Sequence, residues 1–201
     1  MYWRVPILYT VLIIGGFVLQ VTYPRLTEML AILPRDFNHL PGVITTVFMH
    51  ADIGHLSSNI LPLSVCLVGL YYFYNEIALK VTLFCHLLTG ILIWIFARPA
   101  YHIGASGLAY ALVFFILASA LVRKNRRLMV FAFIVLLFQN GLIWGVFPQE
   151  NRISWESHLM GSLVGTLLAF AFRKEGPLPD KPFEWDEESG EEKDEYEDVV
   201  K

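Results

Sequence analysis

Six long apolar stretches occupy most of the chain and are separated by short polar segments. They fall at about residues 6–22, 55–74, 80–97, 105–122, 128–147 and 155–172. Each stretch is close to the roughly 20 residues that a helix needs to cross a hydrocarbon core about 30 Å thick. The pattern predicts an all-α, polytopic membrane protein with a bundle of six transmembrane helices.

The longest connection lies between the first two apolar stretches. In it Leu26, Met29, Leu30 and Leu33 recur at helical spacing, with charged residues among them. This predicts an amphipathic helix that lies in the membrane interface or packs on the outer end of the bundle. The other connections are short, and the chain shows no internal repeat, which disfavours a two-fold transporter.

Composition agrees with a membrane protein, because 56% of the residues are hydrophobic and only 16% are charged. No small-x-small cleavage site follows the first apolar stretch, so we expect a retained signal anchor. The few residues before it leave no room for a mitochondrial presequence, and a bacterial plasma membrane is the expected location.

Basic residues predict the orientation. With a cytoplasmic N-terminus, eight of them lie inside and four lie outside, which favours cytoplasmic N- and C-termini. The inside set is Arg4, Lys80, Arg123, Lys124, Arg126, Arg127, Arg173 and Lys174, and the outside set is Arg25, Arg35, Arg98 and Arg152.

The last part of the chain differs sharply from the rest. From Asp180 onward it holds eleven acidic residues against three lysines. We expect residues 1–175 to form the membrane domain and residues 176–201 a disordered, acidic cytoplasmic tail. Cys66 and Cys85 lie in different apolar stretches without a C-x-x-C pattern, so they are read as buried side chains.

Polar residues inside apolar stretches are costly and therefore point to function. His55 and Asn59 are spaced i, i+4 and share a helix face, and His50 precedes them across a break at Asp52. The alternative is that Asp52 caps the helix while the two histidines lie at the membrane interface.

Two further segments combine glycines with one reactive side chain. Gly104 and Gly107 flank Ser106 at the start of the fourth stretch, where free N–H groups can stabilise an anion. His158 in the last stretch is followed by Gly161 and Gly165, a G-x-x-x-G face that admits another helix. If that helix carries Ser106, His158 can reach the hydroxyl. Alone, the segment around Ser106 could be a small-residue packing motif between helices, and His158 could be a polar residue with satisfied hydrogen bonds in an apolar helix.

Together the three segments resemble the rhomboid family of intramembrane serine proteases, over nearly all of residues 1–175. The family pattern H-x-x-x-x-H-x-x-x-N appears as His50, His55 and Asn59, G-x-S-G as Gly104, Ala105, Ser106 and Gly107 with Tyr110 following, and H-x-x-G-x-x-x-G as His158, Gly161 and Gly165.

The resemblance implies a Ser-His dyad with Ser106 as nucleophile and His158 as general base, and Tyr110 against the imidazole. The Ser106 N–H, His55 and Asn59 would bind the oxyanion. His50 would support hydrogen bonding and hydration of the site. The partners implied are the lipid bilayer and transmembrane protein substrates, with no cofactor, metal or nucleic acid.

Some features depart from this pattern or allow other functions. Many relatives carry a Trp-Arg pair in the first loop, where this chain has Pro41 and Gly42. The family's lateral gate involves the fifth stretch, in which Gly141 and Gly145 could loosen the helix or pack closely.

Two other functions remain open. One is a catalytically inactive, rhomboid-like protein that binds membrane clients. The other is a metal or proton transporter that uses His50, His55 and His158.

Overall fold

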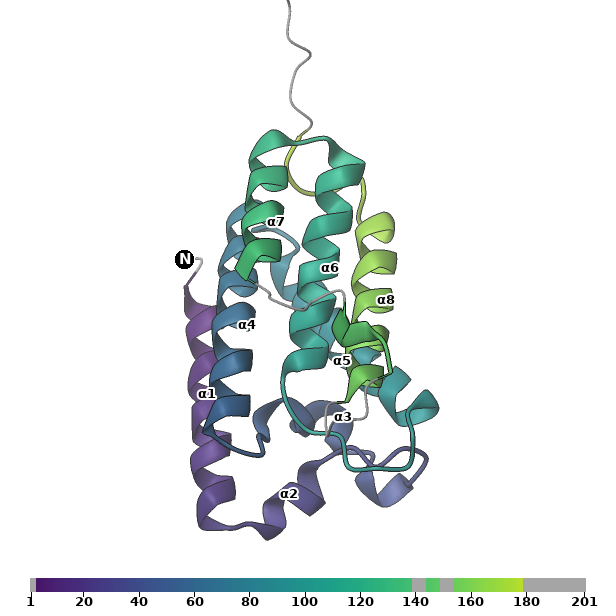
Figure 1. Cartoon of the computed structure of the whole chain (residues 1–201). Helices are drawn as coiled ribbons and strands as arrows, with labels where there is room; N and C mark the ends of the chain where they lie inside the picture. Colours follow the sequence, from purple (N-terminus) through teal and green to yellow (C-terminus); the bar gives the residue numbers. More distant parts are fainter. Residues whose placement is uncertain (1–2, 139–143, 149–153, 179–201) are drawn as a thin grey trace, which may run out of the picture.

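The computed structural model describes residues 3–138, 144–148 and 154–178. Its elements are α1 (Arg4–Thr22), α2 (Arg25–Leu30), η1 (Phe37–His39), α3 (Gly42–Thr45), η2 (Thr46–Phe48), α4 (Ile53–Phe73), α5 (Ala78–Phe96), α6 (Ser106–Arg123), α7 (Arg126–Phe138), η3 (Trp144–Val146) and α8 (Trp155–Ala171). All of these are helices, so the all-α prediction is confirmed (Figure 1).

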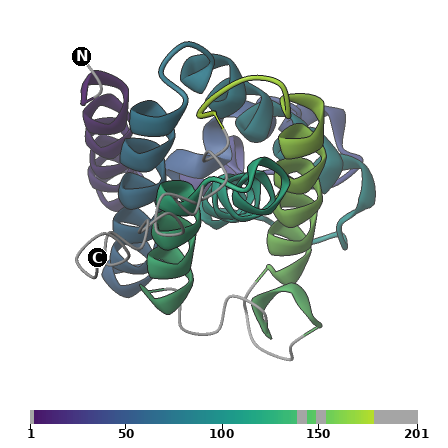
Figure 2. The same ribbon diagram turned by 90° about the horizontal axis from the view of Figure 1, so that it is seen from above.

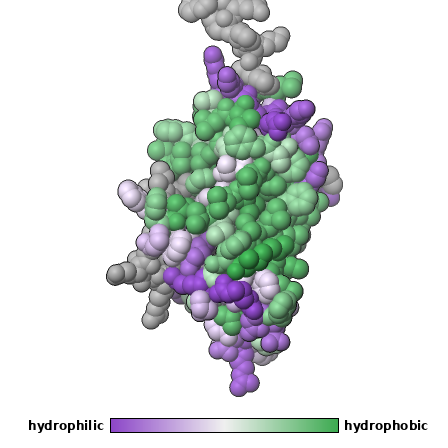
Figure 3. Space-filling model, turned by 90° about the vertical axis from the view of Figure 1, so that its right-hand side faces the viewer, coloured by the Kyte–Doolittle hydropathy of each residue, from purple (hydrophilic) through white to green (hydrophobic). Residues whose placement is uncertain are grey.

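Four of the described helices, α1, α4, α5 and α6, are long and apolar enough to cross a membrane. On the face shown in Figure 3, apolar side chains form a broad band and hydrophilic residues gather toward the two ends. The chain is therefore an integral membrane protein. Helix length alone does not confirm the prediction of six transmembrane helices, because α8 has 17 residues and α7 has 13 described residues.

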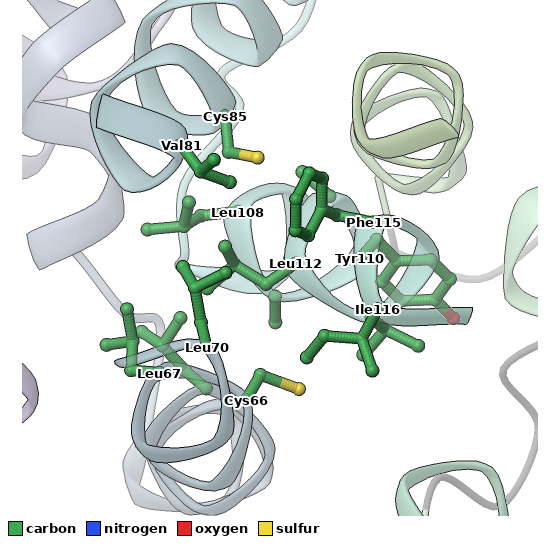
Figure 4. Close-up of a cluster of buried hydrophobic side chains, with 14 of the residues drawn as sticks. Cys66, Leu67, Leu70, Val81, Cys85, Leu108, Tyr110, Leu112, Phe115 and Ile116 are labelled. Carbon is green, nitrogen blue, oxygen red and sulfur yellow. The ribbon is translucent and has the colours of Figure 1, made fainter. Parts of the chain in front are cut away.

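Helix α6 lies at the centre of the bundle, with α4, α5, α7 and α8 around it (Figure 2). Its side chains form the middle of the core, where Leu112 and Phe115 meet Leu67 and Leu70 of α4 and Cys85 of α5 (Figure 4). Helix α1 lies at the edge and leaves most of its apolar side chains exposed, as expected for contact with lipid. Cys66 and Cys85 are both buried and free, as the sequence predicts.

The segment between α1 and α4 contains four short helices. The amphipathic helix predicted there is only the six-residue α2, which contains no buried residue. The chain then turns inward, where Ile32 forms a two-way backbone bridge with His102, with N–O distances of 2.8 and 3.1 Å. This bridge joins the first loop to the segment that leads into α6.

The fifth apolar stretch departs from the prediction of one helix over residues 128–147. Gly141 lies outside the described residues, and Gly145 lies in η3 instead of in α7. Gly145 is buried, because its backbone lies close to the side chains of Tyr110 and His158. Of the two alternatives for Gly145, close packing describes its surroundings in the structure, and loosening of the helix stays a prediction.

The end of the described chain is bound to the end of α6. The buried Arg123 guanidinium donates to the carbonyl oxygens of Arg173 at 2.7 Å, Glu175 at 2.6 Å and Gly176 at 3.0 Å, and also to that of Pro177. Residues 173–178, called the C-terminal strap below, thus include the first residues of the predicted tail. The rest of that tail lies outside the described residues.

Candidate active site

The sequence-predicted residues meet at a cavity of about 570 Å³. It opens among the helix ends that carry the three motifs. Its lining consists of Ala51, Asp52, His55, Ser58, Asn59, Pro62, Tyr101, Ile103, Ser106, Ala109, Tyr110, Ser154 and His158. His50 is not in the lining, because it is fully buried behind His55.

The start of α4 presents His55 and Asn59 to the cavity. Asp52 caps this helix by accepting the backbone N–H of His55 at 2.8 Å. The Ala51 N–H lies 3.4 Å from His55 Nδ1, so Nδ1 acts as acceptor and Nε2 of the neutral ring carries the hydrogen. Asn59 Nδ2 donates to the His55 carbonyl at 2.7 Å and keeps a second hydrogen. Both side chains can thus offer a donor to the cavity.

Helix α6 begins at Ser106, after a backbone that only glycine permits. Gly104 has a φ of 107°, and a Cβ there would lie 2.7 Å from the His55 ring. The backbone nitrogen of the next residue, Ala105, donates a hydrogen bond to His50 Nε2 at 3.4 Å. Among the described residues neither the N–H nor the hydroxyl of Ser106 has a hydrogen-bond partner. Both are available to a ligand in the cavity.

His50 holds the loop between η2 and α4 in place. Its backbone N–H and carbonyl both bond the Gln20 side chain, at 2.9 and 2.7 Å. Burial, together with the neighbouring His55, lowers the pKa of His50 to about 4. The neutral ring can therefore accept the hydrogen of Ala105.

Helix α8 brings His158 to α6 through glycines. A Cβ on Gly161 would strike the Gly107 carbonyl oxygen, and one on Gly165 would strike the Ala111 carbonyl oxygen. Gly107 in turn leaves room for the backbone of Ser157, whose carbonyl oxygen would lie 3.3 Å from a Cβ there. The two backbones therefore approach more closely than any larger residue would allow.

The His158 imidazole is held on one face and at one edge. Tyr110 stacks on it with ring centroids 4.1 Å apart and an interplanar angle of 4°. Nδ1 lies 2.9 Å from the carbonyl oxygen of Gly145. No hydrogen bond joins His158 to Ser106 in the part of the chain that the structure describes, although both line the cavity.

The structure adds polar contacts that the sequence did not reveal. His102 Nε2 lies 3.1 Å from the Arg98 carbonyl, and Nδ1 lies 2.5 Å from Ser154 Oγ. Burial lowers the pKa of His102, so its neutral Nδ1 accepts the Ser154 hydrogen. This side chain ties the loop before Ser106 to the start of α8.

Glu156 of α8 lies beside that tie. Its Oε1 is 3.4 Å from Arg98 Nε, an ion pair between the same two segments. His102 lies only two residues before Gly104, but its neighbours in the sequence do not indicate that it bonds Ser154 at the start of α8. Across the described ranges, the His, Cys, Asp and Glu side chains form no group of three arranged to hold a metal ion.

Comparisons of the sequence with known proteins point to one family. A family model described as Rhomboid domain matches residues 38–175. An uncharacterized protein of Mycobacterium tuberculosis is 31% identical over 165 residues, which cover 75% of this chain and 66% of the relative. An uncharacterized protein of Mycobacterium leprae is 30% identical over 144 residues, which cover 64% and 55% of the two chains. The matched region thus spans less than two thirds of the length of these curated relatives.

Proposed function

The chain belongs to the rhomboid family, and on that premise we propose that it is an intramembrane serine endopeptidase that cleaves transmembrane segments of other membrane proteins. One observation carries the proposal, namely that Ser106, His158, His55 and Asn59 line the same cavity. A nucleophile, a base and two hydrogen-bond donors around one space are the parts that acyl transfer requires.

In the proposed reaction Ser106 Oγ attacks the carbonyl carbon of the scissile peptide, and its proton passes to His158 Nε2. The C–N bond then breaks, and the imidazolium returns that proton to the departing amine. A water molecule attacks the carbonyl carbon of the resulting acyl-enzyme and loses a proton to His158. The bond between this carbon and Ser106 Oγ then breaks, the imidazolium returns the proton to Ser106 Oγ, and the carboxylic acid product leaves.

The negative oxygen formed during attack needs donors that are already in place. The Ser106 N–H, His55 Nε2–H and the second hydrogen of Asn59 Nδ2 supply candidates on α4 and α6. Loss of one such donor typically costs about 10²–10³ in rate. Gly104 allows the chain to pass directly over the His55 ring, which keeps this donor next to Ser106.

The proposed substrate is a helix that can unwind near the outer membrane face, because peptide bonds within a regular helix are hidden in its hydrogen-bond ladder. Gly and Pro near the cleavage site would favour unwinding. We infer that the protein lies in a bacterial plasma membrane, with the N-terminus and the acidic C-terminal tail in the cytoplasm. The distribution of basic residues and the composition of the tail support this placement.

The test is labelling of detergent-solubilised protein by a fluorophosphonate probe that reacts with activated serines. We expect wild type to be labelled and Ser106→Ala to remain unlabelled. His158→Ala should be labelled at least about 10²-fold more slowly than wild type. Ser58→Ala is the matched control, because Ser58 lines the same cavity but its hydroxyl already donates to the His55 carbonyl at 2.9 Å.

An unlabelled wild type that is folded and accessible to the probe would overturn the proposal. The catalytically inactive, client-binding function would then take its place. Cleavage of a reconstituted transmembrane substrate by wild type, and not by Ser106→Ala, extends the same test to the peptide bond.

A further inference from the structure

The His158 ring has one nitrogen engaged before any substrate arrives. Nδ1 lies 2.9 Å from the carbonyl oxygen of Gly145, which can only accept a hydrogen bond. Nδ1 must therefore carry the hydrogen, and in the neutral imidazole the lone pair lies on Nε2. That tautomer is the one a base needs in order to take a proton through Nε2.

We propose that the backbone carbonyl of Gly145 is the positioning group of His158, in the place that a carboxylate occupies in a Ser-His-Asp triad. The inference rests on the proposed function, because it assigns a role to Gly145 in the same reaction. Gly145 touches neither substrate nor the reacting atoms, and it acts by fixing the orientation and the tautomer of the imidazole.

A carbonyl suits this location better than a carboxylate. His158 is buried, and an ionised group beside it would need its own partners to repay the loss of hydration. Glu156, the acidic residue two positions away, is paired with Arg98 instead. A peptide dipole supplies direction and a proton acceptor without adding a buried charge.

The contact requires glycine at position 145. A Cβ there would strike the Tyr110 hydroxyl and lie 3.1 Å from His158 Nδ1. Tyr110 stacks on the imidazole face while the Gly145 carbonyl meets its edge, so rotation of the ring is opposed in two directions. A methyl group would push the carbonyl away from Nδ1 or displace the Tyr110 ring.

The positioning group lies on a different segment from both reacting residues. Ser106 begins α6 and His158 belongs to α8, whereas Gly145 lies in η3. Val146 beside it packs on the hydrophobic core, and this contact holds η3 against α6 and α8. The tautomer of His158 therefore shows whether the Gly145 carbonyl of η3 is in contact with Nδ1.

The experiment is ¹⁵N NMR of the full-length protein in detergent micelles at neutral pH, with labelled histidine. The His158 signals are assigned by their loss in His158→Gln. We expect hydrogen on Nδ1 in wild type, and in Gly145→Ala a shift toward hydrogen on Nε2. Gly15→Ala is the control, because no atom lies within 4 Å of a Cβ at that position.

Activity gives the second readout. We expect Gly145→Ala to slow fluorophosphonate labelling at least tenfold, while Gly15→Ala retains the wild-type rate. Wild type with hydrogen on Nε2, or Gly145→Ala with unchanged tautomer and labelling rate, would overturn the inference even if wild type is an active protease. The expected tautomer in a protein that the probe cannot label would instead overturn the proposed function.

Discussion

Single glycines set how closely α8 can approach α6. A Cβ on Gly161 or Gly165 would meet backbone atoms of α6, which cannot rotate away as a side chain can. We expect Gly161→Ala to lower the free energy of unfolding by about 1–3 kcal/mol, the usual cost of overpacking. Probe labelling should fall with it, because His158 lies one helical turn away on the same helix.

Thermal unfolding in detergent measures this effect, with Gly15→Ala as control. In that exposed helical position alanine should be neutral or stabilising by up to about 1 kcal/mol. Equal stability of Gly161→Ala and Gly15→Ala would show that α6 and α8 do not touch at this glycine.

The neutral state of His50 predicts a pH dependence of stability. Its pKa is about 4 in the folded protein and about 6.5 in an unfolded chain, so the unfolded state binds more protons between these values. Stability should be complete above about pH 6.5 and should decrease toward pH 4, by about 3 kcal/mol from this residue. Unfolding at pH 7.5 and pH 5 measures the difference.

His50→Gln keeps an acceptor for the Ala105 N–H and removes the titrating ring, so it should flatten part of this dependence. His39→Gln, at a partly exposed position in the first loop, is the matched control and should leave the slope intact. An unchanged slope in His50→Gln would contradict the assignment to this residue.

At the residue scale, the spacing of residues in the sequence predicted which side chains share a helix face. It did not predict hydrogen bonds between residues far apart in the sequence. The spacing of His55 and Asn59 predicted their common face, since i, i+4 geometry is fixed within one helix. The carbonyl of Gly145 could not be identified, because every residue has a carbonyl and only tertiary packing aims this one at His158. The tie between His102 and Ser154 likewise joins segments 52 residues apart.

At the element scale, helix ends followed the polar boundaries of the apolar stretches. The second stretch was predicted at about 55–74 and is Ile53–Phe73, because Asp52 caps the helix just before the apolar run. The fifth was predicted too long, since the apolar character continues through Trp144 and Phe147 although η3 is a separate turn. Hydrophobicity indicates which residues are shielded from water, but it does not indicate at which residue a helix ends.

Helix α6 also holds the C-terminal strap through one side chain. The Arg123 guanidinium bonds carbonyl oxygens of four strap residues, and the adjacent Asn125 Nδ2 donates to the Leu178 carbonyl at 2.7 Å. Arg123→Ala should lower the free energy of unfolding by at least about 2 kcal/mol, because a single hydrogen bond to a charged group contributes about 1.5–3 kcal/mol. Trypsin should then cut faster after Arg173 or Lys174.

Limited proteolysis followed by mass spectrometry measures the cutting rate. Arg127→Ala is the control, because Arg127 lies exposed in the first turn of α7 and makes none of the strap hydrogen bonds of Arg123 and Asn125. Arg123→Lys keeps the charge but loses the planar fork, and it should give an intermediate rate. Equal rates in all four proteins would show that Arg123 does not hold the strap.

At the scale of the whole molecule, the apolar band and the basic residues together predict an orientation in the membrane. The start of α1 and the end of α8 lie toward the same end of the bundle, and α2, η1 and α3 lie at the other (Figure 1). Eight basic residues of the predicted inside set outnumber four of the outside set. The positive-inside rule then predicts that the first loop and the opening of α6 lie outside the cell.

Cysteine labelling can test this orientation without a background signal, because Cys66 and Cys85 are both fully buried. In intact bacterial cells a membrane-impermeant maleimide should label Asn38→Cys, which lies exposed in the first loop. Ser189→Cys in the acidic tail should react only after the cells are permeabilised. The reverse pattern would place the Ser106 end of the cavity in the cytoplasm, and proposed substrates would then be cut near their inner membrane face.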